Sequence, residues 1–348
     1  MATQIQLQST NYNGQIADIT FYPCSGGTIS LGNQTIPYTY TNDNYEGTYD
    51  LFFSAFNQTC QLVITCPTPT PTVTPTNTAT PTPTTTPTQT PTPSVSPGPL
   101  IDPDAQAFFN AITASGGTLT TTEQSAVNTL VIDLKGYNLW NKMIGLYPVV
   151  GTTSVTQSFN LKDPTTYNLS FSGTWAHTAG GAEPTSTGYA RTGMIPSIIN
   201  FNSLGSIHGS MYITENLNTS GYDMGAIGGG EFDATSSYGN NIAYIGVNTG
   251  NFTAANGGTT KRNFLWTNNG STSSIYANGG LLGSGSYGLD ANTPNEIILS
   301  GINLFGYPAQ FTGRNWALAS IGLGMNSTEA FNYNTAVLMF QTTLGRQN

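Results

Sequence analysis

Charged residues are scarce in this sequence. Only 7% of its 348 residues are Asp, Glu, Lys or Arg, compared with roughly 25% in an average soluble domain. Lys and Arg together number 8, and the first of them is Lys135. Nucleic-acid binding depends on Lys and Arg side chains that displace counterions, so this shortage excludes a nucleic-acid partner. It also excludes a basic patch for binding a membrane surface.

Long apolar runs are also missing. No stretch approaches the ~18 consecutive apolar residues of a membrane-spanning helix, so we expect no membrane insertion. The first residues, MATQIQLQSTNYNGQIADITFYP, contain neither the basic nor the apolar segment of a secretory signal. Gly, Thr, Asn and Ser replace the missing charges, which is typical of proteins with many short strands and turns.

Histidine and cysteine are too few for several kinds of site. The only histidines are His177 and His208, and no G-x-S-x-G motif is present, so we predict no catalytic residue and no enzyme activity. The cysteines are Cys24, Cys60 and Cys66. Their odd number argues against a closed disulfide framework. Buried thiols and a single Cys24–Cys60 disulfide both remain open, so the redox state is not predicted.

Three changes of composition divide the chain. Residues 1–66 alternate short β-branched and aromatic runs with Gly- and Asn-containing turns, which predicts a small all-β domain. Eleven of the 20 prolines lie in residues 67–99, among many threonines, and predict an extended Pro/Thr rod over 67–101. A plain flexible linker is the alternative. A domain as small as 1–66 buries little core, so we expect an assembly partner to stabilise it as an anchor.

Residues 102–149 contain a helical pattern. Asp102-Pro103 starts the first predicted helix. Thr120 and Glu123 have the spacing of a capping box, and an apolar stripe continues from there to Trp140, which we expect in the core. We therefore predict two helices in this segment.

Residues 150–348 contain short strands at regular intervals. Residues 207–214 alternate in polarity, which predicts a buried face and a wet face that carries His208, Ser210 and Tyr212. Asn278-Gly279 is typical of a type I′ hairpin turn. A last helix is expected from Asn326 or Ser327 to Gly345. The predicted fold is mostly β: a small N-terminal β-barrel or sandwich, the rod, and an antiparallel jelly-roll β-sandwich preceded by a helical pair.

The C-terminal part, residues 102–348, resembles the concanavalin A-like lectin (laminin-G-like) modules of tailed-phage structural proteins. The resemblance depends on residues 102–151, 159–193, 275–282 and 316–348. It implies a two-sheet jelly roll exposed on a virus particle, with glycan binding as a tendency of such modules. It brings no catalytic residues.

These observations predict a virion surface protein of the head-fibre or tail-fibre type. We expect it to be made in the host cytoplasm and to become extracellular on the particle, although secretion without a cleaved signal also fits. Residues 1–66 would bind other virion proteins, and the sandwich, as part of a homo-oligomer, would bind host-surface glycan weakly and at many copies. The alternatives are a purely structural capsid decoration protein and, third, a polysaccharide-degrading tail component.

Candidate glycan contacts are aromatic residues that lie among amides and hydroxyls, because sugars pack on ring faces. The candidates are Trp175, His177, Tyr189, Trp266 and Tyr287. Glu231 and Asp233 are the only close acidic pair of the predicted sandwich, and they resemble the start of the legume-lectin metal loop. The Asn, Asp and His ligands that follow in that loop are absent here. We predict no cofactor, with Ca²⁺ at this pair as the metal alternative.

Overall fold

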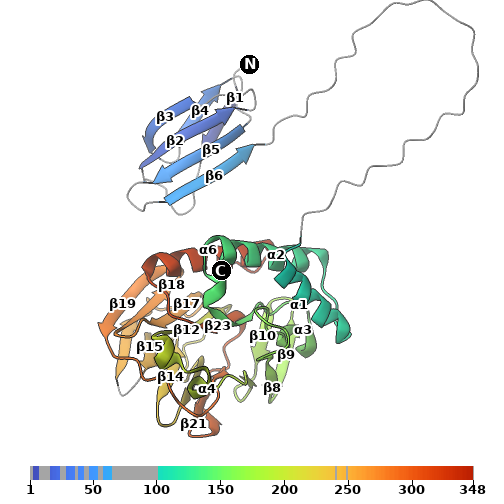
Figure 1. The fold of residues 1–348 in the computed structure, drawn as a ribbon, viewed down its shortest axis with the longest axis vertical. Helices are drawn as coiled ribbons and strands as arrows, with labels where there is room; N and C mark the ends of the chain where they lie inside the picture. The colour runs from blue at the N-terminus through green and yellow to red at the C-terminus, as the bar shows by residue number, and fades with distance from the viewer. Residues whose placement is uncertain are drawn as a thin grey trace, which may run out of the picture. The chain divides into compact units, whose positions relative to one another are not determined.

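The structure, a computed structural model, divides into two compact units, Met1–Thr92 and Pro93–Asn348 (Figure 1). They are called the N-terminal unit and the sandwich unit below. The structure describes six strands between residues 3 and 64. It also describes residues 101–347, except 240, 248 and 249. Residues 67–100 of the predicted rod and the side chains of the three cysteines lie outside the described residues.

The described part of the N-terminal unit is entirely β. One antiparallel sheet pairs β1 with β4, and a second has the order β3-β2-β5-β6. Ile19 on β2 is fully buried. The strands are β1 (Thr3–Leu7), β2 (Ile16–Pro23), β3 (Ile29–Thr35), β4 (Tyr38–Asn42), β5 (Gly47–Phe53) and β6 (Gln58–Ile64).

Limited proteolysis should cut the chain between residues 67 and 101, because a Pro/Thr-rich segment has few apolar side chains to bury. Trypsin has no site before Lys135, so a protease of broad specificity such as proteinase K is needed. All four tryptophans belong to the sandwich unit, and their fluorescence should not change on cleavage. A red shift on cleavage would show that the two units depend on each other for folding.

Two sheets face each other in the sandwich unit. The first has the order β19-β18-β17-β12-β23-β10-β9, with β7 paired to β23. Its strands are β7 (Met143–Tyr147), β9 (Trp175–Thr178), β10 (Gly181–Pro184), β12 (Ile207–Ile213), β17 (Asn263–Asn268), β18 (Thr272–Ala277), β19 (Gly280–Ser286) and β23 (Trp316–Gly322). Because β7 lies within residues 102–149, the segment predicted as helical also contributes a strand to this sheet.

The second sheet has the order β16-β15-β14-β13-β20-β11-β8, with β21 paired to β13 and β22 to β21. Its strands are β8 (Ser170–Ser172), β11 (Tyr189–Arg191), β13 (Met224–Ile227), β14 (Glu231–Thr235), β15 (Ile242–Val247), β16 (Asn251–Ala255), β20 (Ile298–Leu299), β21 (Ile302–Leu304) and β22 (Tyr307–Ala309). Nearly all pairs are antiparallel, and β13–β21 is parallel. A core that includes Phe232, Phe264, Trp266 and Trp316 fills the space between the sheets.

Helices form a third layer, on the first sheet. They are α1 (Pro103–Ala114), α2 (Thr121–Gly136) and α6 (Ser327–Thr343), and Figure 1 shows α2 and α6 along one side of the unit. A second core cluster joins Leu130, Tyr333 and Phe340 of these helices to Leu265 and Leu318 of the sheet. The first sheet is therefore covered on both faces. Shorter helices are α3 (Ser154–Ser158), α4 (Pro196–Ile199), α5 (Phe201–Leu204) and the 3₁₀ helix η1 (Trp140–Lys142).

Local sequence signals set most of the helix ends and the hairpin. Asp102, Thr120 and Asn326 cap α1, α2 and α6, the last two in complete capping boxes. Asn278 and Gly279 have φ values of 49° and 77° between β18 and β19, which confirms the type I′ turn. No helix in the described ranges has the length and apolar character needed to cross a membrane.

The predicted wet face of β12 is wrong. His208, Ser210 and Tyr212 are all buried, because the helical layer covers the face on which they lie. His208 Nδ1 pairs with the Leu323 carbonyl at 2.6 Å, and Nε2 with Ser320 Oγ at 3.0 Å. Burial lowers the pKa of His208 to about 4, so this histidine is neutral in the folded chain.

Candidate functional site

The outer face of the second sheet carries the candidate site, because the long helices α1, α2 and α6 pack on the first sheet. Along β14, Phe232 and Ala234 enter the core, so the alternating residues Glu231 and Asp233 belong to the outer face. Along β15 the same alternation places Tyr244 and Gly246 outward, since Ala243, Ile245 and Val247 are core residues. Asp233 is paired in register with Gly246.

The two carboxyl groups converge on Gly246. A Cβ at this glycine would lie 2.2 Å from Asp233 Oδ1 and 2.4 Å from Glu231 Oε1. Both oxygens thus surround the same point, and their separation cannot exceed the sum of those distances. On the other neighbouring strand, a Cβ at Gly225 would lie 2.5 Å from Asp233 Cβ. The paired carboxyls therefore occupy space that only glycine leaves free on both sides.

The pair has few internal partners. Asp233 is fully buried and Glu231 is partly exposed. No hydrogen bond of regular geometry reaches Glu231 Oε1 or either carboxyl oxygen of Asp233. Burial raises the pKa of Glu231 to about 7. Burial, and then the charge of Glu231, raise the pKa of Asp233 well above its usual range, although Gly246 and Tyr244 partly oppose this.

Three tyrosines stand beside the carboxyls. The ring centroids of Tyr238 and Tyr244 are 5.9 Å apart with planes inclined by 26°. Tyr222 lies 5.5 Å from Tyr238 and 5.8 Å from Tyr244. Tyr238 is 45% exposed, whereas Tyr222 is 8% exposed. Tyr238 therefore presents the accessible aromatic surface, and the other two rings support it.

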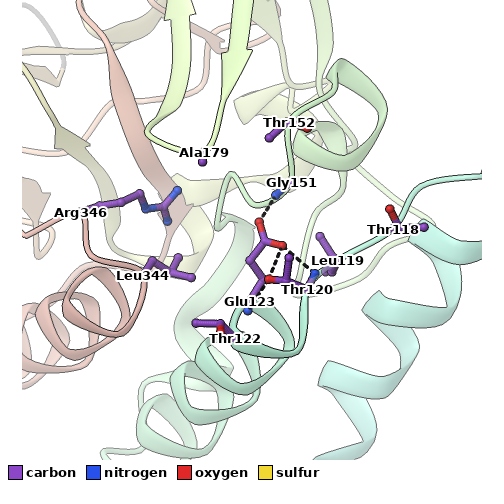
Figure 2. Close-up of a pocket in the computed structure, with 10 residues that line it drawn as sticks. All are labelled: Thr118, Leu119, Thr120, Thr122, Glu123, Gly151, Thr152, Ala179, Leu344 and Arg346. Carbon is purple, nitrogen blue, oxygen red and sulfur yellow. Dashed lines mark hydrogen bonds between the residues drawn. The ribbon is translucent and has the colours of Figure 1, made fainter.

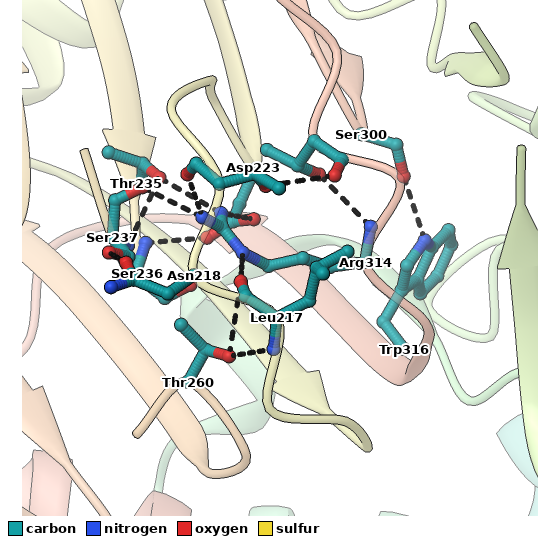
Figure 3. A network of polar contacts seen from close by, with 12 residues as sticks. Leu217, Asn218, Asp223, Thr235, Ser236, Ser237, Thr260, Ser300, Arg314 and Trp316 are labelled. Atoms are coloured by element: carbon teal, nitrogen blue, oxygen red, sulfur yellow. Dashed lines mark hydrogen bonds and ion pairs between the residues drawn. The ribbon is translucent and has the colours of Figure 1, made fainter. Parts of the chain in front are cut away.

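A buried ion pair fixes the chain segments that carry two of these tyrosines (Figure 3). Arg314 and Asp223 are both fully buried and are 2.7 Å apart. Arg314 also donates to the carbonyls of Leu217 (2.8 Å) and Ser237 (2.7 Å). Asp223 directly follows Tyr222, and Ser237 directly precedes Tyr238. The network thus holds both tyrosines at the end of β14. We call Tyr222, Tyr238, Tyr244, Glu231 and Asp233 the tyrosine–carboxyl site.

Of the candidates predicted from the sequence, Trp266 requires a correction. It is fully buried between the sheets, so it offers no surface to a glycan. A large aromatic residue on β17, with both sides of the sheet covered, belongs to the core.

The other four candidates do not gather at one place. Trp175 and His177 share β9 and stack 6.2 Å apart, and His177 Nδ1 pairs with Gln157 Oε1 at 2.7 Å. Tyr189 belongs to the second sheet and stacks on Phe311. Tyr287 follows β19 and packs against the inter-sheet core.

Sequence reasoning missed Tyr222, Tyr238 and Tyr244. The signal for Tyr244 was the alternation of β15, IAYIGV, which turns it to the same face as Gly246. Tyr222 and Tyr238 lie outside regular strands, so no periodicity connects them to the carboxyls.

The acidic pair does not make a metal site by itself. Among the residues that the structure describes, no group of three His, Cys, Asp or Glu side chains could hold a metal ion. Ca²⁺ takes about six to eight oxygen ligands, and the site supplies two carboxyls beside tyrosine hydroxyls.

A pocket of about 430 Å³ lies at the start of α2 (Figure 2). Its charged groups already have protein partners. Glu123 accepts from the Thr120 and Gly151 amides at 2.8 and 2.7 Å. Arg346 donates to the Val149 carbonyl at 2.8 Å. The contacts in this pocket therefore cap helix α2 and fix the C-terminal segment. For this reason we place the candidate site on the second sheet.

No protein-family model and no curated protein matches the sequence. Among solved structures, a domain of an extracellular arabinanase from Geobacillus stearothermophilus, in complex with arabinotriose, aligns at 12% identity and a TM-score of 0.41, over 55% of this chain and 98% of that one. A Trypanosoma rangeli sialidase variant aligns at 11% identity and a TM-score of 0.42, over 64% of this chain and 39% of that one. A sialidase carbohydrate-binding module from Ruminococcus gnavus, bound to α2,3-sialyllactose, aligns at 13% identity and a TM-score of 0.28, over 36% and 80%. Similarity at this level assigns neither a family nor a ligand.

Proposed function

We propose that this chain is a surface protein of a virus particle whose sandwich unit binds carbohydrate without catalysis. In this proposal residues 1–66 attach to other virion proteins, the Pro/Thr rod provides reach, and homo-oligomeric copies bind a host-surface glycan together. The resemblance of residues 102–348 to phage lectin-like modules and the low charge of the chain support the setting.

The single observation that carries carbohydrate binding is the tyrosine–carboxyl site. Sugar rings pack their C–H faces on aromatic rings and donate hydroxyl hydrogens to nearby acceptors. Tyr238 offers an exposed ring, 45% accessible, and the partly exposed Glu231 carboxyl of the same site offers an acceptor. One exposed ring and few acceptors predict a modest affinity, with a Kd on the order of 0.1–1 mM, which many copies on one particle raise.

Replacing Tyr238 with Ala should weaken glycan binding about tenfold or more, because the exposed ring face is lost. The full chain, coupled to beads so that it is multivalent, is tested on an array of bacterial-envelope and other glycans. Tyr307→Ala is the matched control, since Tyr307 is 78% exposed on β22 and is not part of the site. Equal loss in both variants, or no binding of any glycan by the parent chain, would contradict the proposal.

Glycan hydrolysis is a second candidate, favoured by the convergence of Glu231 and Asp233 on Gly246. Glycosidases use two carboxyl groups, ~5–9.5 Å apart, with one pKa raised. The full burial of Asp233 argues against its reaching a scissile bond. Incubating the chain with glycans that bind and measuring new reducing ends decides between the two: products that disappear in Asp233→Asn would establish hydrolysis.

A further inference from the structure

The carboxyl pair has few hydrogen-bond donors near it: beside Asp233 they are the Gly246 amide and the Tyr244 hydroxyl, and neither makes a bond of regular geometry. Its unpartnered buried atoms, Glu231 Oε1 and both oxygens of Asp233, can only accept when the groups are ionised. The residues beneath and beside them, Gly246 and Gly225, bring no side chain. An isolated pair of this kind is costly to ionise, so a proton or a bound cation has to balance its charge.

No cationic side chain in the described part of the chain fills this role. Among the described residues, Lys135, Lys142, Arg191 and Arg314 form ion pairs with other carboxylates. No cationic side chain is among the causes of the raised pKa of Glu231 or Asp233. The groups that face the pair are the neutral hydroxyls of Tyr244 and Tyr222. Tyr238 is linked to the pair through its contact with Tyr222.

We infer that the tyrosine–carboxyl site recognises an amino sugar, whose ammonium group takes the place of a proton shared by Glu231 and Asp233. This inference depends on the proposed function. Glu231 is the partly exposed member, so it meets the ligand at the surface, with Asp233 beneath as the second negative charge. An ammonium group offers three donors and no acceptor, and its charge is attracted to the face of a tyrosine ring such as Tyr238.

The exchange is balanced in charge. In the free protein one proton remains on the pair, and when the ammonium binds, this proton leaves to the solvent while one positive charge enters the site. No covalent bond forms or breaks other than the carboxyl O–H bond. An N-acetylated sugar lacks the charge and places a carbonyl oxygen toward carboxylates, whereas an acidic sugar adds a negative charge. Both should therefore bind more weakly than the free amine.

The test compares tetramers of β-1,4-linked glucosamine and galactosamine with their fully N-acetylated forms, using the full chain and isothermal titration calorimetry near pH 7. We expect the free-amine tetramers to bind roughly ten- to a hundredfold more tightly. The apparent binding enthalpy should change with the ionisation enthalpy of the buffer, because binding releases a proton. A purely structural carboxyl pair would not produce this release.

Variants separate the inference from the proposed function. Glu231→Gln and Asp233→Asn should each abolish proton release and reduce the preference for the amine to less than threefold. Glu183→Gln is the control, since this carboxyl on β10 is already bonded to Thr178. If N-acetylated or neutral tetramers bind as tightly as the amines, the inference is wrong and carbohydrate binding stands. If no glycan of any class binds, both are wrong.

Discussion

The double variant Glu231→Gln/Asp233→Asn should be more stable than the parent chain near pH 8, and about equally stable near pH 4. Both carboxyl pKa values are raised in the folded state, to about 7 for Glu231. An acid with a raised folded pKa contributes stability that is fully present below its unfolded pKa, near 4, and is lost as the pH rises through the folded pKa. The amides of the double variant do not ionise, so the variant does not lose stability as the pH rises.

The expected gain near pH 8 is roughly 2 kcal/mol, reduced because Glu231 is partly exposed to solvent. For a unit of this size it corresponds to about 5 °C in melting temperature. Tryptophan fluorescence follows the sandwich unit alone, since all four tryptophans lie there. Glu183→Gln should show no such pH-dependent gain. A double variant that melts below the parent near pH 8 would mean that the ionised pair has a partner in the folded chain.

Arg314→Met should destabilise the sandwich unit by about 3–5 kcal/mol, because it leaves Asp223 charged and buried without its partner. Both residues are fully buried, and the guanidinium also bonds the Leu217, Thr219 and Ser237 carbonyls. Urea unfolding, followed by tryptophan fluorescence, measures the loss. Adding Asp223→Asn should restore part of it, since no unpaired charge then remains.

The matched control for this cycle is Arg191→Met. Arg191 pairs with Glu296, but its side chain is 39% exposed, so the loss should be at most about 1 kcal/mol. If the two arginine variants lower the free energy of unfolding by the same amount, the burial of the Arg314 network is not what stabilises the unit. If Asp223→Asn does not restore stability in the Arg314→Met background, the carbonyl contacts outweigh the ion pair.

Much of the candidate site could not be predicted from the sequence. Glu231 and Asp233 were recognisable as an acidic pair two residues apart on a strand, which places them on one face. Their convergence and burial depend on Gly246, Gly225 and Tyr244, which come from neighbouring strands. Trp266 was wrongly chosen, because a surface aromatic residue and a core aromatic residue have the same local sequence context.

The local elements could be predicted from neighbouring residues alone: the capped helices, the Asn278-Gly279 turn and the mostly β class. Each depends on residues within a few positions of one another, where backbone preferences and capping act. Which sheet face is free follows from how the helices pack on the sheets. The helical layer buried the second face of β12, including His208, and left the outer face of β14 and β15 to carry the site. Burial and charge pairing are set by contacts between segments far apart in the chain, and a single strand's alternation cannot distinguish a face that meets water from one that meets a helix.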